Sequence, residues 1–265
     1  LKGVGLHTGL EVEINFLPAD INNGYTFRRI DLEGMPIIKA DANIVTNTQR
    51  GTCLEKNGVS IQTCEHVLAA LVGLEIDNVI IELSTSEPPI MDGSSKYFVE
   101  ALESVGTKEQ EAFREVFVVK DVISYSDEET GSEITIIPSD EYQITTMVDF
   151  GTKVLGTQNA TLQHLSDFKE EISDSRTFSF LHELETLLEH GLIKGGDLNN
   201  AIVYVDKPIS KETMERLKVA FNKDSISVKA NGILDNLTLH TPNEAARHKL
   251  LDVIGDLALI GTRIQ

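Results

Sequence analysis

Residues 63–74 read TCEHVLAALVGL, and residues 247–260 read RHKLLDVIGDLALI. Both segments are apolar on nearly every side, and a helix of that kind lies inside a protein rather than on its surface. Each carries a histidine near its beginning, in the short echo EHVL and RHKL. Strand-like patterns occur in both halves of the chain. We therefore predict an α+β fold in which two similar halves face each other, each with a small sheet and one buried helix.

The other regular elements follow from periodicity and turn signals. Strict alternation over residues 10–16 predicts a strand with one buried face. The remaining predicted strands cover residues 25–30, 79–83, 116–124, 133–137, 142–150 and 201–205, with irregular strands over 36–60 around a turn at Asn57-Gly58. The predicted helices cover residues 63–74 (capped by Thr63), 94–105, 177–190 and 243–260 (capped by Asn243). The polar stretch 106–114 reads as a linker, which divides the chain into domains at 1–108 and 115–265.

Length, charge and cysteine content limit the classes of function. The chain has 265 residues with 42 acidic and 23 basic side chains, a formal net charge of -19. Such a field argues against a general nucleic-acid or anionic-membrane binder, although a few local cations can still hold an anionic small molecule. No apolar run approaches the roughly 20 residues that span a bilayer. Cys53 and Cys64 form no CxxC pair and read as reduced thiols of a cytoplasmic protein.

The second apolar helix carries charged groups that need an explanation. His248 and Asp252 are four residues apart, so both project from one face, and Asp256 lies one turn further along. An exposed His–Asp pair of this kind is common and adds little stability. A buried pair needs a partner or a metal ion. The pattern alone leaves both alternatives open.

The first apolar helix has the same feature at its beginning, where Glu65 and His66 precede a run without other polar side chains. Glu65 alone could simply complement the positive end of the helix dipole. Two histidines and one aspartate, however, match the composition of a catalytic zinc site whose fourth position is open to water. A carboxylate beside that water could take its proton. The spacing does not itself bring the two helices together, and the HExxH motif is absent.

Several longer motifs point to one family. TCEHVLAALVGL, IDNVIIEL, EPPIMDGSS, SRTFSF and RHKLLDVIGDLALIG follow one another in an order that resembles the zinc-dependent UDP-3-O-acyl-N-acetylglucosamine deacetylases of lipid A synthesis. The opening GVGLHTG fits that family as well, and the similarity extends over nearly the whole chain. The resemblance implies two two-layer α/β sandwich domains, with a small insert in each and the active site between them. It also implies a cytoplasmic, monomeric enzyme whose partner is an acylated UDP-sugar.

The resemblance assigns a role to each candidate residue. The ligands of the Zn2+ cofactor would be His66, His248 and Asp252. Glu65 would be the general base acting on the metal-bound water, and Thr177 would stabilise the oxyanion. Lys249 would supply positive charge near the substrate phosphates, and Asp256 would orient a further histidine.

Residues 177–205 form a segment with two readings. From the pattern alone, its apolar stripe is explained by ordinary core packing. By resemblance, it is the insert that encloses the fatty acyl chain of the substrate, where burial of methylene groups supplies affinity. The substrate-binding residues would then be Phe178, Phe180, Leu184, Ile193, Gly196, Leu198 and Val203.

The histidine that Asp256 would orient lies, in the family, beyond the helix that ends here at Ile260. None of the seven histidines of this chain has a matching position, so we expect the native chain to continue past Gln265. In some bacteria the family is fused to a hydroxyacyl-carrier-protein dehydratase. The predicted reaction is hydrolysis of the 2-acetamido group of UDP-3-O-(3-hydroxyacyl)-N-acetylglucosamine, with release of acetate. The alternatives are a catalytically impaired or non-catalytic binding module of the same fold, and a metal amidohydrolase for another acylated sugar.

Overall fold

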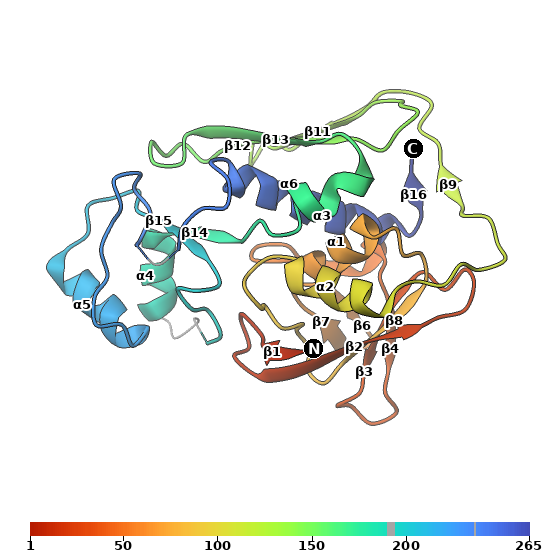
Figure 1. Cartoon of the computed structure of the whole chain (residues 1–265), viewed down its shortest axis with the longest axis horizontal. Coiled ribbons are helices and arrows are strands. Elements are labelled where there is room, and N and C mark those ends of the chain that lie inside the picture. Colours follow the sequence, from red (N-terminus) through yellow and green to blue (C-terminus); the bar gives the residue numbers. More distant parts are fainter. Residues whose placement is uncertain (190–193, 236) are drawn as a thin grey trace.

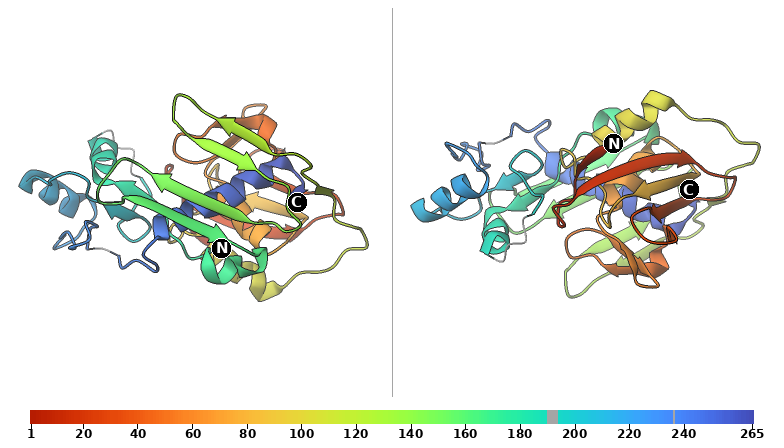
Figure 2. Two further views of the ribbon diagram at one scale, coloured as in Figure 1. Left: turned by 90° about the horizontal axis from the view of Figure 1, so that it is seen from above. Right: turned by 90° about the horizontal axis from the view of Figure 1, so that it is seen from below.

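The computed structural model of the chain describes residues 1–189, 194–235 and 237–265. Its main body has a layered arrangement in which two helical layers lie between two layers of strands (Figure 1). The layers come from the two halves of the chain, as the views from above and below show (Figure 2). The chain therefore has the α+β fold that the sequence predicts, with the two apolar helices in the middle.

The first half builds a five-stranded sheet. Its order is β1-β2-β8-β3-β4, in which β8 runs parallel to β3 and antiparallel to β2. The alternation predicted for residues 10–16 is seen in β2, where Val12 and Ile14 are buried and point to the helices. The strands are β1 Lys2–Val4, β2 Glu11–Pro18, β3 Tyr25–Arg29, β4 Ile37–Lys39 and β8 Val79–Leu83.

Two helices and a small second sheet complete this half. The helices are α1 Glu65–Gly73 and α2 Lys96–Val105. The small sheet holds β5 Val45–Asn47, β6 Cys53–Lys56 and β7 Val59–Ile61, after the 3-10 turn η1 Ala42–Ile44. Asn57 and Gly58, both at positive φ, form the predicted turn between β6 and β7. The prediction that Thr63 caps α1 is wrong: Cys64 occupies the cap position, because the Thr63 hydroxyl donates instead to Glu87.

The second half places hairpins over the long helix α6. α6 covers Glu244–Leu257 and continues as the 3-10 turn η3 Ala258–Ile260, so the predicted helix ends three residues early. The predicted strand 116–124 is broken, because its first part pairs with the chain end while its last part enters a hairpin. The other elements are β9 Val116–Phe117, β10 Ile123–Ser126, β11 Glu133–Ile136, β12 Ile144–Asp149, β13 Thr157–Leu162, η2 Leu165–Asp167, α3 Phe168–Glu171 and β16 Arg263–Ile264.

A separate lobe at one end of the molecule is formed by β14 Phe178–Phe180, α4 Leu181–Glu189, β15 Ile202–Tyr204 and α5 Lys211–Ala220 (Figure 1). The predicted helix 177–190 is wrong in its first turn. Phe178 and Phe180 are two residues apart and pack on one side of a strand that pairs in parallel with β15. That i, i+2 spacing is the period of a strand, and pairing with β15 outweighs the helical pattern of the residues that follow.

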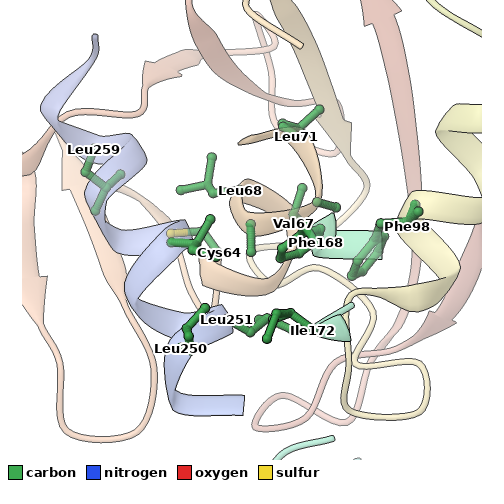
Figure 3. Close-up of a cluster of buried hydrophobic side chains, with 14 of the residues drawn as sticks. Cys64, Val67, Leu68, Leu71, Phe98, Phe168, Ile172, Leu250, Leu251 and Leu259 are labelled. Atoms are coloured by element: carbon green, nitrogen blue, oxygen red, sulfur yellow. The ribbon is translucent and has the colours of Figure 1, made fainter. Parts of the chain in front are cut away.

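The core is centred on the contact between α1 and α6 (Figure 3). Leu68 and Leu71 of α1 and Leu250 and Leu251 of α6 are fully buried in one cluster that contains residues from both halves. A smaller cluster, described below, belongs to the end lobe. The domain boundaries at 108 and 115 remain a prediction. Among the described residues, no helix has the length and apolar character needed to cross a membrane.

Gly255 determines how closely the two central helices approach. A Cβ atom at this position would lie 2.0 Å from the carbonyl oxygen of Glu65 and 2.8 Å from its carbonyl carbon. These neighbours are backbone atoms of the facing helix, which cannot rotate away as a side chain can. Only glycine therefore permits this helix crossing.

We predict that Gly255→Ala lowers the free energy of unfolding by about 1–3 kcal/mol or more, because overpacking forces α1 and α6 apart. Urea denaturation monitored by circular dichroism measures the change. Gly34→Ala is the control: Gly34 has φ +76° but nothing within 4 Å of its added Cβ, so it reports backbone strain alone. An unchanged free energy of unfolding in Gly255→Ala would contradict the steric explanation.

Candidate metal and catalytic site

Three polar side chains converge where α1 and α6 cross. His66 lies in the first turn of α1, and His248 and Asp252 are one turn apart on α6. Oδ1 of Asp252 is 3.5 Å from Nε2 of His66 and 3.3 Å from Nε2 of His248. The imidazole rings meet edge to face, with centroids 4.9 Å apart. The structure thus brings together the three residues that the sequence singles out as ligands, each offering one donor atom.

The donor atoms fit a small cation. Bonds of about 2.0–2.1 Å to a tetrahedral zinc ion put its ligand atoms about 3.3–3.4 Å apart, close to both measured separations. Nδ1 of His248 lies 2.9 Å from the carbonyl oxygen of Ser175, which can only accept, so Nδ1 carries the proton. Nε2 of His248 then presents a lone pair to Oδ1 of Asp252, a buried atom without a hydrogen-bond donor among the described residues. Two facing acceptors repel each other unless a cation lies between them.

Electrostatics keep His248 and Asp252 in the protonation states that bind metals. Burial alone would lower the pKa of His66, but its contact with Asp252 and the charge of Glu65 outweigh burial and raise that pKa. Burial lowers the pKa of His248 to about 4, so this imidazole is neutral at physiological pH. Burial alone would raise the pKa of Asp252, but the nearby His248, Lys249 and His66 outweigh it and hold that pKa well below its usual range. Nζ of Lys249 donates to Oδ2 of Asp252 at 2.9 Å, which leaves Oδ1 directed at the histidines.

Glu65 lies beside His66 at the beginning of α1 and is only 7% exposed. Its Oε2 accepts a hydrogen bond from the backbone N–H of Thr52 at 3.0 Å. Burial raises the pKa of Glu65 to about 7, with a smaller contribution from the charge of Asp252. A carboxylate with a pKa near neutrality can both accept and return a proton, which is what a general base needs.

Asp256 lies one turn beyond Asp252, at the rim of the site. Its Oδ1 accepts a hydrogen bond from the Thr52 hydroxyl at 2.6 Å. The residue as a whole reaches the surface, but desolvation of its carboxylate raises its pKa to about 6, against the lowering effect of the Thr52 hydrogen bond. Thr52 thus holds two of the predicted catalytic carboxylates, Glu65 through its backbone and Asp256 through its side chain.

Lys249 and Phe178 form the side of the site that faces the end lobe. Nζ of Lys249 lies 5.7 Å from the centroid of the Phe178 ring, within the range of a cation–π contact. The Phe178 ring also meets the ring of His248 at 6.4 Å. Thr177, half-buried, precedes Phe178, and its backbone N–H donates to Gly93 while its carbonyl accepts from Ile202. The segment with Thr177 therefore borders the candidate metal-ligand cluster of His66, His248 and Asp252.

The residues predicted to bind the acyl chain fall into different surroundings. Phe180 is 5% exposed and packs with an aromatic group of Phe150, Phe178 and Tyr204. Leu184, Leu198 and Val203 are buried together in the small cluster of the end lobe, with Leu217 and Leu234 among their neighbours. Gly196 lies half-buried in the loop before β15. Ile193 lies outside the described residues.

The glycine-rich loop of residues 5–9 connects the first half to the end lobe. Glu87, fully buried, accepts hydrogen bonds from the backbone of His7 and Thr8 and from the Thr8 hydroxyl. On the opposite side of the loop, the N–H of Gly195 donates to the carbonyl of Leu6. Nε2 of His7 contacts the carbonyl oxygen of Arg50, close to the Thr52 segment. This loop is thus fixed between the two parts of the molecule that border the site.

Sequence reasoning misses three residues that orient the site. Ser175 acts through its backbone carbonyl, and Thr52 acts through its backbone N–H towards Glu65 and its hydroxyl towards Asp256. The sequence pattern signals neither contact. Gly255 does leave a signal in the sequence. Glycine destabilises a helix, so a glycine inside a strongly apolar helix indicates that another backbone approaches closely.

Comparisons with known proteins identify the family of the chain. The family model described as "LpxC: UDP-3-O-acyl N-acetylglycosamine deacetylase" matches residues 1–221 and 218–265. The "Bifunctional enzyme LpxC/FabZ" of Bacteroides thetaiotaomicron is 47% identical over 265 residues, which are 100% of this chain and 58% of the relative. That of Porphyromonas gingivalis is 45% identical, over 100% of this chain and 57% of its own length.

A relative that is named only as a deacetylase is similar as well. The "UDP-3-O-acyl-N-acetylglucosamine deacetylase" of Saccharophagus degradans is 39% identical over 99% of this chain and 79% of its own length. The chain thus spans less than three fifths of the two bifunctional relatives and about four fifths of this third one. Because the family model covers the whole chain and the identities are high, the chain belongs to the UDP-3-O-acyl-N-acetylglycosamine deacetylase (LpxC) family.

Proposed function

We propose that this chain carries the catalytic site of a zinc-dependent deacetylase that hydrolyses the 2-acetamido group of UDP-3-O-(3-hydroxyacyl)-N-acetylglucosamine and releases acetate, the committed step of lipid A synthesis. One observation carries the proposal. Oδ1 of Asp252 and the unprotonated Nε2 of His248 face each other at 3.3 Å in a buried site, with Nε2 of His66 at 3.5 Å. This arrangement favours a bound cation and fits the family to which the chain belongs.

Zinc held by His66, His248 and Asp252 would lower the pKa of a coordinated water and polarise the amide carbonyl. Glu65 is the general base in this proposal, because it neighbours His66 in the chain and has a pKa of about 7. The Thr52 N–H holds Oε2 of Glu65, so the carboxylate is oriented before the substrate arrives. Glu65 would take a proton from this water and later give it to the departing amine.

Positive charge and hydrogen bonding support the developing negative charge. Lys249 is 42% exposed at its side chain, so its ammonium group can meet a substrate while it contacts Asp252. Attraction to Asp252 raises the pKa of Lys249, which keeps it cationic. Thr177 would add its hydroxyl to the oxyanion, and Asp256 would orient a further histidine. In a chain of net charge -19, such local cations decide whether a diphosphate binds.

The end lobe is the proposed enclosure for the acyl chain. Its small cluster is apolar and belongs to the same lobe as Phe178, which touches His248. An acyl chain could enter beside this cluster and exchange contact with water for contact with leucine and valine side chains.

The bifunctional names of two relatives also make a dehydratase unit in the full-length protein a part of the proposal.

We expect purified protein to contain about one zinc ion per chain, and its removal by a chelator to lower deacetylation by more than about a hundredfold. Elemental analysis and an acetate-release assay measure both, and added Zn2+ should restore the rate. His66→Ala should abolish zinc binding, whereas His164→Ala should not, because His164 is an exposed partner of Glu141. Folded protein without stoichiometric zinc would contradict the proposal and favour a non-catalytic binding module.

We predict that Glu65→Gln keeps its zinc but loses deacetylation by about 10²–10⁴-fold, the usual contribution of a general base. The amide has the shape of the carboxylate but does not accept a proton at neutral pH. Zinc content and kcat are measured on the same preparation. Glu13→Gln, which removes one exposed ion pair with Lys2, is the control and should keep the normal rate. A normal rate in Glu65→Gln would rule out this residue as the base.

The acyl-chain proposal predicts a dependence of kcat/KM on chain length. Each buried methylene contributes about 0.8 kcal/mol, so removing one should lower kcat/KM by about fourfold until the chain no longer reaches the lobe. A series of substrates that differ only in the 3-O-acyl group measures this slope. A flat series would contradict the enclosure, and preference for a different sugar would favour the amidohydrolase alternative.

A further inference from the structure

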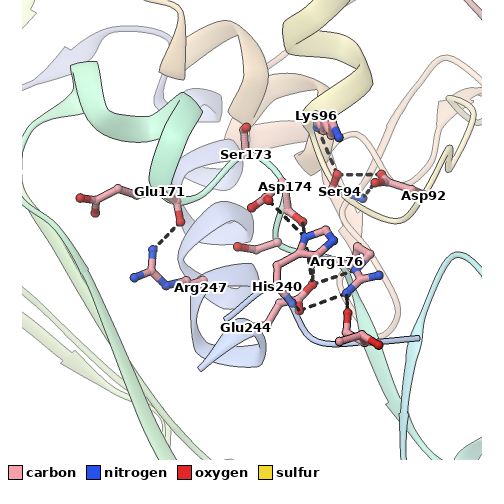
Figure 4. A network of polar contacts seen from close by, with 12 residues as sticks. Asp92, Ser94, Lys96, Glu171, Ser173, Asp174, Arg176, His240, Glu244 and Arg247 are labelled. Atoms are coloured by element: carbon pink, nitrogen blue, oxygen red, sulfur yellow. Dashed lines mark hydrogen bonds and ion pairs between the residues drawn. The ribbon is translucent and has the colours of Figure 1, made fainter. Parts of the chain in front are cut away.

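Glu244 and His248 lie one turn apart on α6, so both project from the same face. The segment 173–177 runs past this face, and Figure 4 shows the polar contacts that connect the two. Ser175 contacts His248, and the next residue, Arg176, contacts Glu244. One short segment therefore meets one helix face at two neighbouring points.

The contact between Arg176 and Glu244 is buried and fully hydrogen-bonded. Arg176 is 6% exposed and Glu244 0%. Oε1 of Glu244 accepts from the backbone N–H and from Nε of Arg176, at 3.1 and 2.8 Å, and Oε2 accepts from Nη2 at 3.2 Å. Oε2 also accepts from the backbone N–H of His240 at 2.7 Å. The planar guanidinium and the carboxylate thus fix each other in both distance and orientation.

Other contacts hold the segment against the opposite helix layer. The carbonyl of Ser173 accepts from the N–H of Ser95, and the N–H of Thr177 donates to the carbonyl of Gly93. Gly93 and Ser95 belong to the turn that leads into α2. These backbone bonds attach the segment to the first half of the chain. The Arg176–Glu244 pair attaches the same segment to α6, between Ser173 and Thr177.

A buried ion pair is a poor way to gain stability, because the cost of desolvating two charges offsets their attraction. Apolar side chains of similar size would hold the segment to α6 equally well. They would not, however, define the register between the segment and the helix, because apolar contacts are not directional. The register matters here, because it determines where the Ser175 carbonyl stands relative to Nδ1 of His248.

We propose that the Arg176–Glu244 pair is a positioning device for His248. It fixes the Ser175 carbonyl so that Nδ1 of His248 carries the proton and Nε2 is presented to the metal ion. Arg176 and Glu244 are thus positioning residues that act through Ser175. The inference rests on the proposed function in one respect, namely that His248 is a metal ligand.

The test compares two buried arginines that make the same kinds of hydrogen bonds. Arg176 binds one carboxylate through two nitrogens and also the carbonyl of Thr238; Arg29 binds Asp31 in the same way and also the carbonyl of Ser60. Arg29 is buried as well, but it lies in β3, away from the metal-ligand cluster. Lysine keeps the charge at either position and removes the planar fork.

We expect Arg176→Lys to weaken zinc binding by about 10–100-fold, the usual effect of losing an outer partner of a metal ligand, and to shift the visible absorption of the Co2+-substituted protein. Arg29→Lys should change neither by more than about twofold. Chelator competition gives the affinity, and thermal unfolding of the metal-free proteins gives the stability of each variant. Equal zinc affinity of folded Arg176→Lys and wild type would overturn the proposal.

A second variant covers the case in which Arg176→Lys does not fold. Arg176→Met/Glu244→Leu replaces the pair by apolar side chains, so we expect it to fold and still to bind zinc more weakly. Nitrogen-15 NMR of the metal-free proteins gives the His248 tautomer: the wild type should carry the proton on Nδ1, and the double variant should populate both tautomers. This readout needs no metal, so a wild type that binds no zinc refutes the proposed function alone, whereas an unchanged tautomer in the double variant refutes this inference.

Discussion

The contact between α1 and α6 at Gly255 is the constraint on which the site depends. The absence of a side chain there lets the backbone of Glu65 approach α6 within van der Waals distance. His66 follows Glu65 directly, and His248 and Asp252 lie within two turns of Gly255 on the same helix. Any wider crossing would separate Nε2 of His66 from Oδ1 of Asp252. The arrangement of the metal-ligand cluster is therefore a consequence of helix packing, and the sheets on either side serve to press the two helices together.

The buried charges of this protein are arranged in layers around that contact. The innermost layer holds His66, His248 and Asp252, of which His248 is oriented by Ser175 and Asp252 by Lys249. Thr52 connects Glu65 to Asp256, and Lys249 connects Asp252 to the ring of Phe178. Buried polar groups destabilise a protein when they lack partners. We therefore expect a ligand to pair with the atoms of this network that have no partner in the protein.

Much of the site was predictable, because both central helices have a clear apolar pattern interrupted by ionisable residues. A histidine and a carboxylate in an apolar helical segment, such as His248 and Asp252 one turn apart, mark a candidate site. The pattern left an exposed ion pair open, and the family resemblance assigned His66, His248 and Asp252 as ligands. The first turn of the predicted helix 177–190 was wrong because the strand period of Phe178 and Phe180 is only two residues long and depends on β15, far along the chain. β13 and α5 were missed because their residues are largely polar, and their partners in space decide their structure. Ser175 acts through a backbone carbonyl, which any residue supplies, and the Thr52 hydroxyl meets Asp256 only once distant parts of the chain have packed together.

Because the proposed ligands come from both halves of the chain, their origin has a consequence for how the protein would acquire a metal ion. No local piece of the chain contains the site, since His66 and His248 meet only after the two helices have packed. Formation of such distant contacts is slow relative to local structure. If the proposed zinc site forms, metal capture would be a late event in folding, and a bound ion would stabilise the assembled state further as the ion concentration rises above its Kd. Cellular zinc supply would then act on the amount of folded protein as well as on its catalytic turnover.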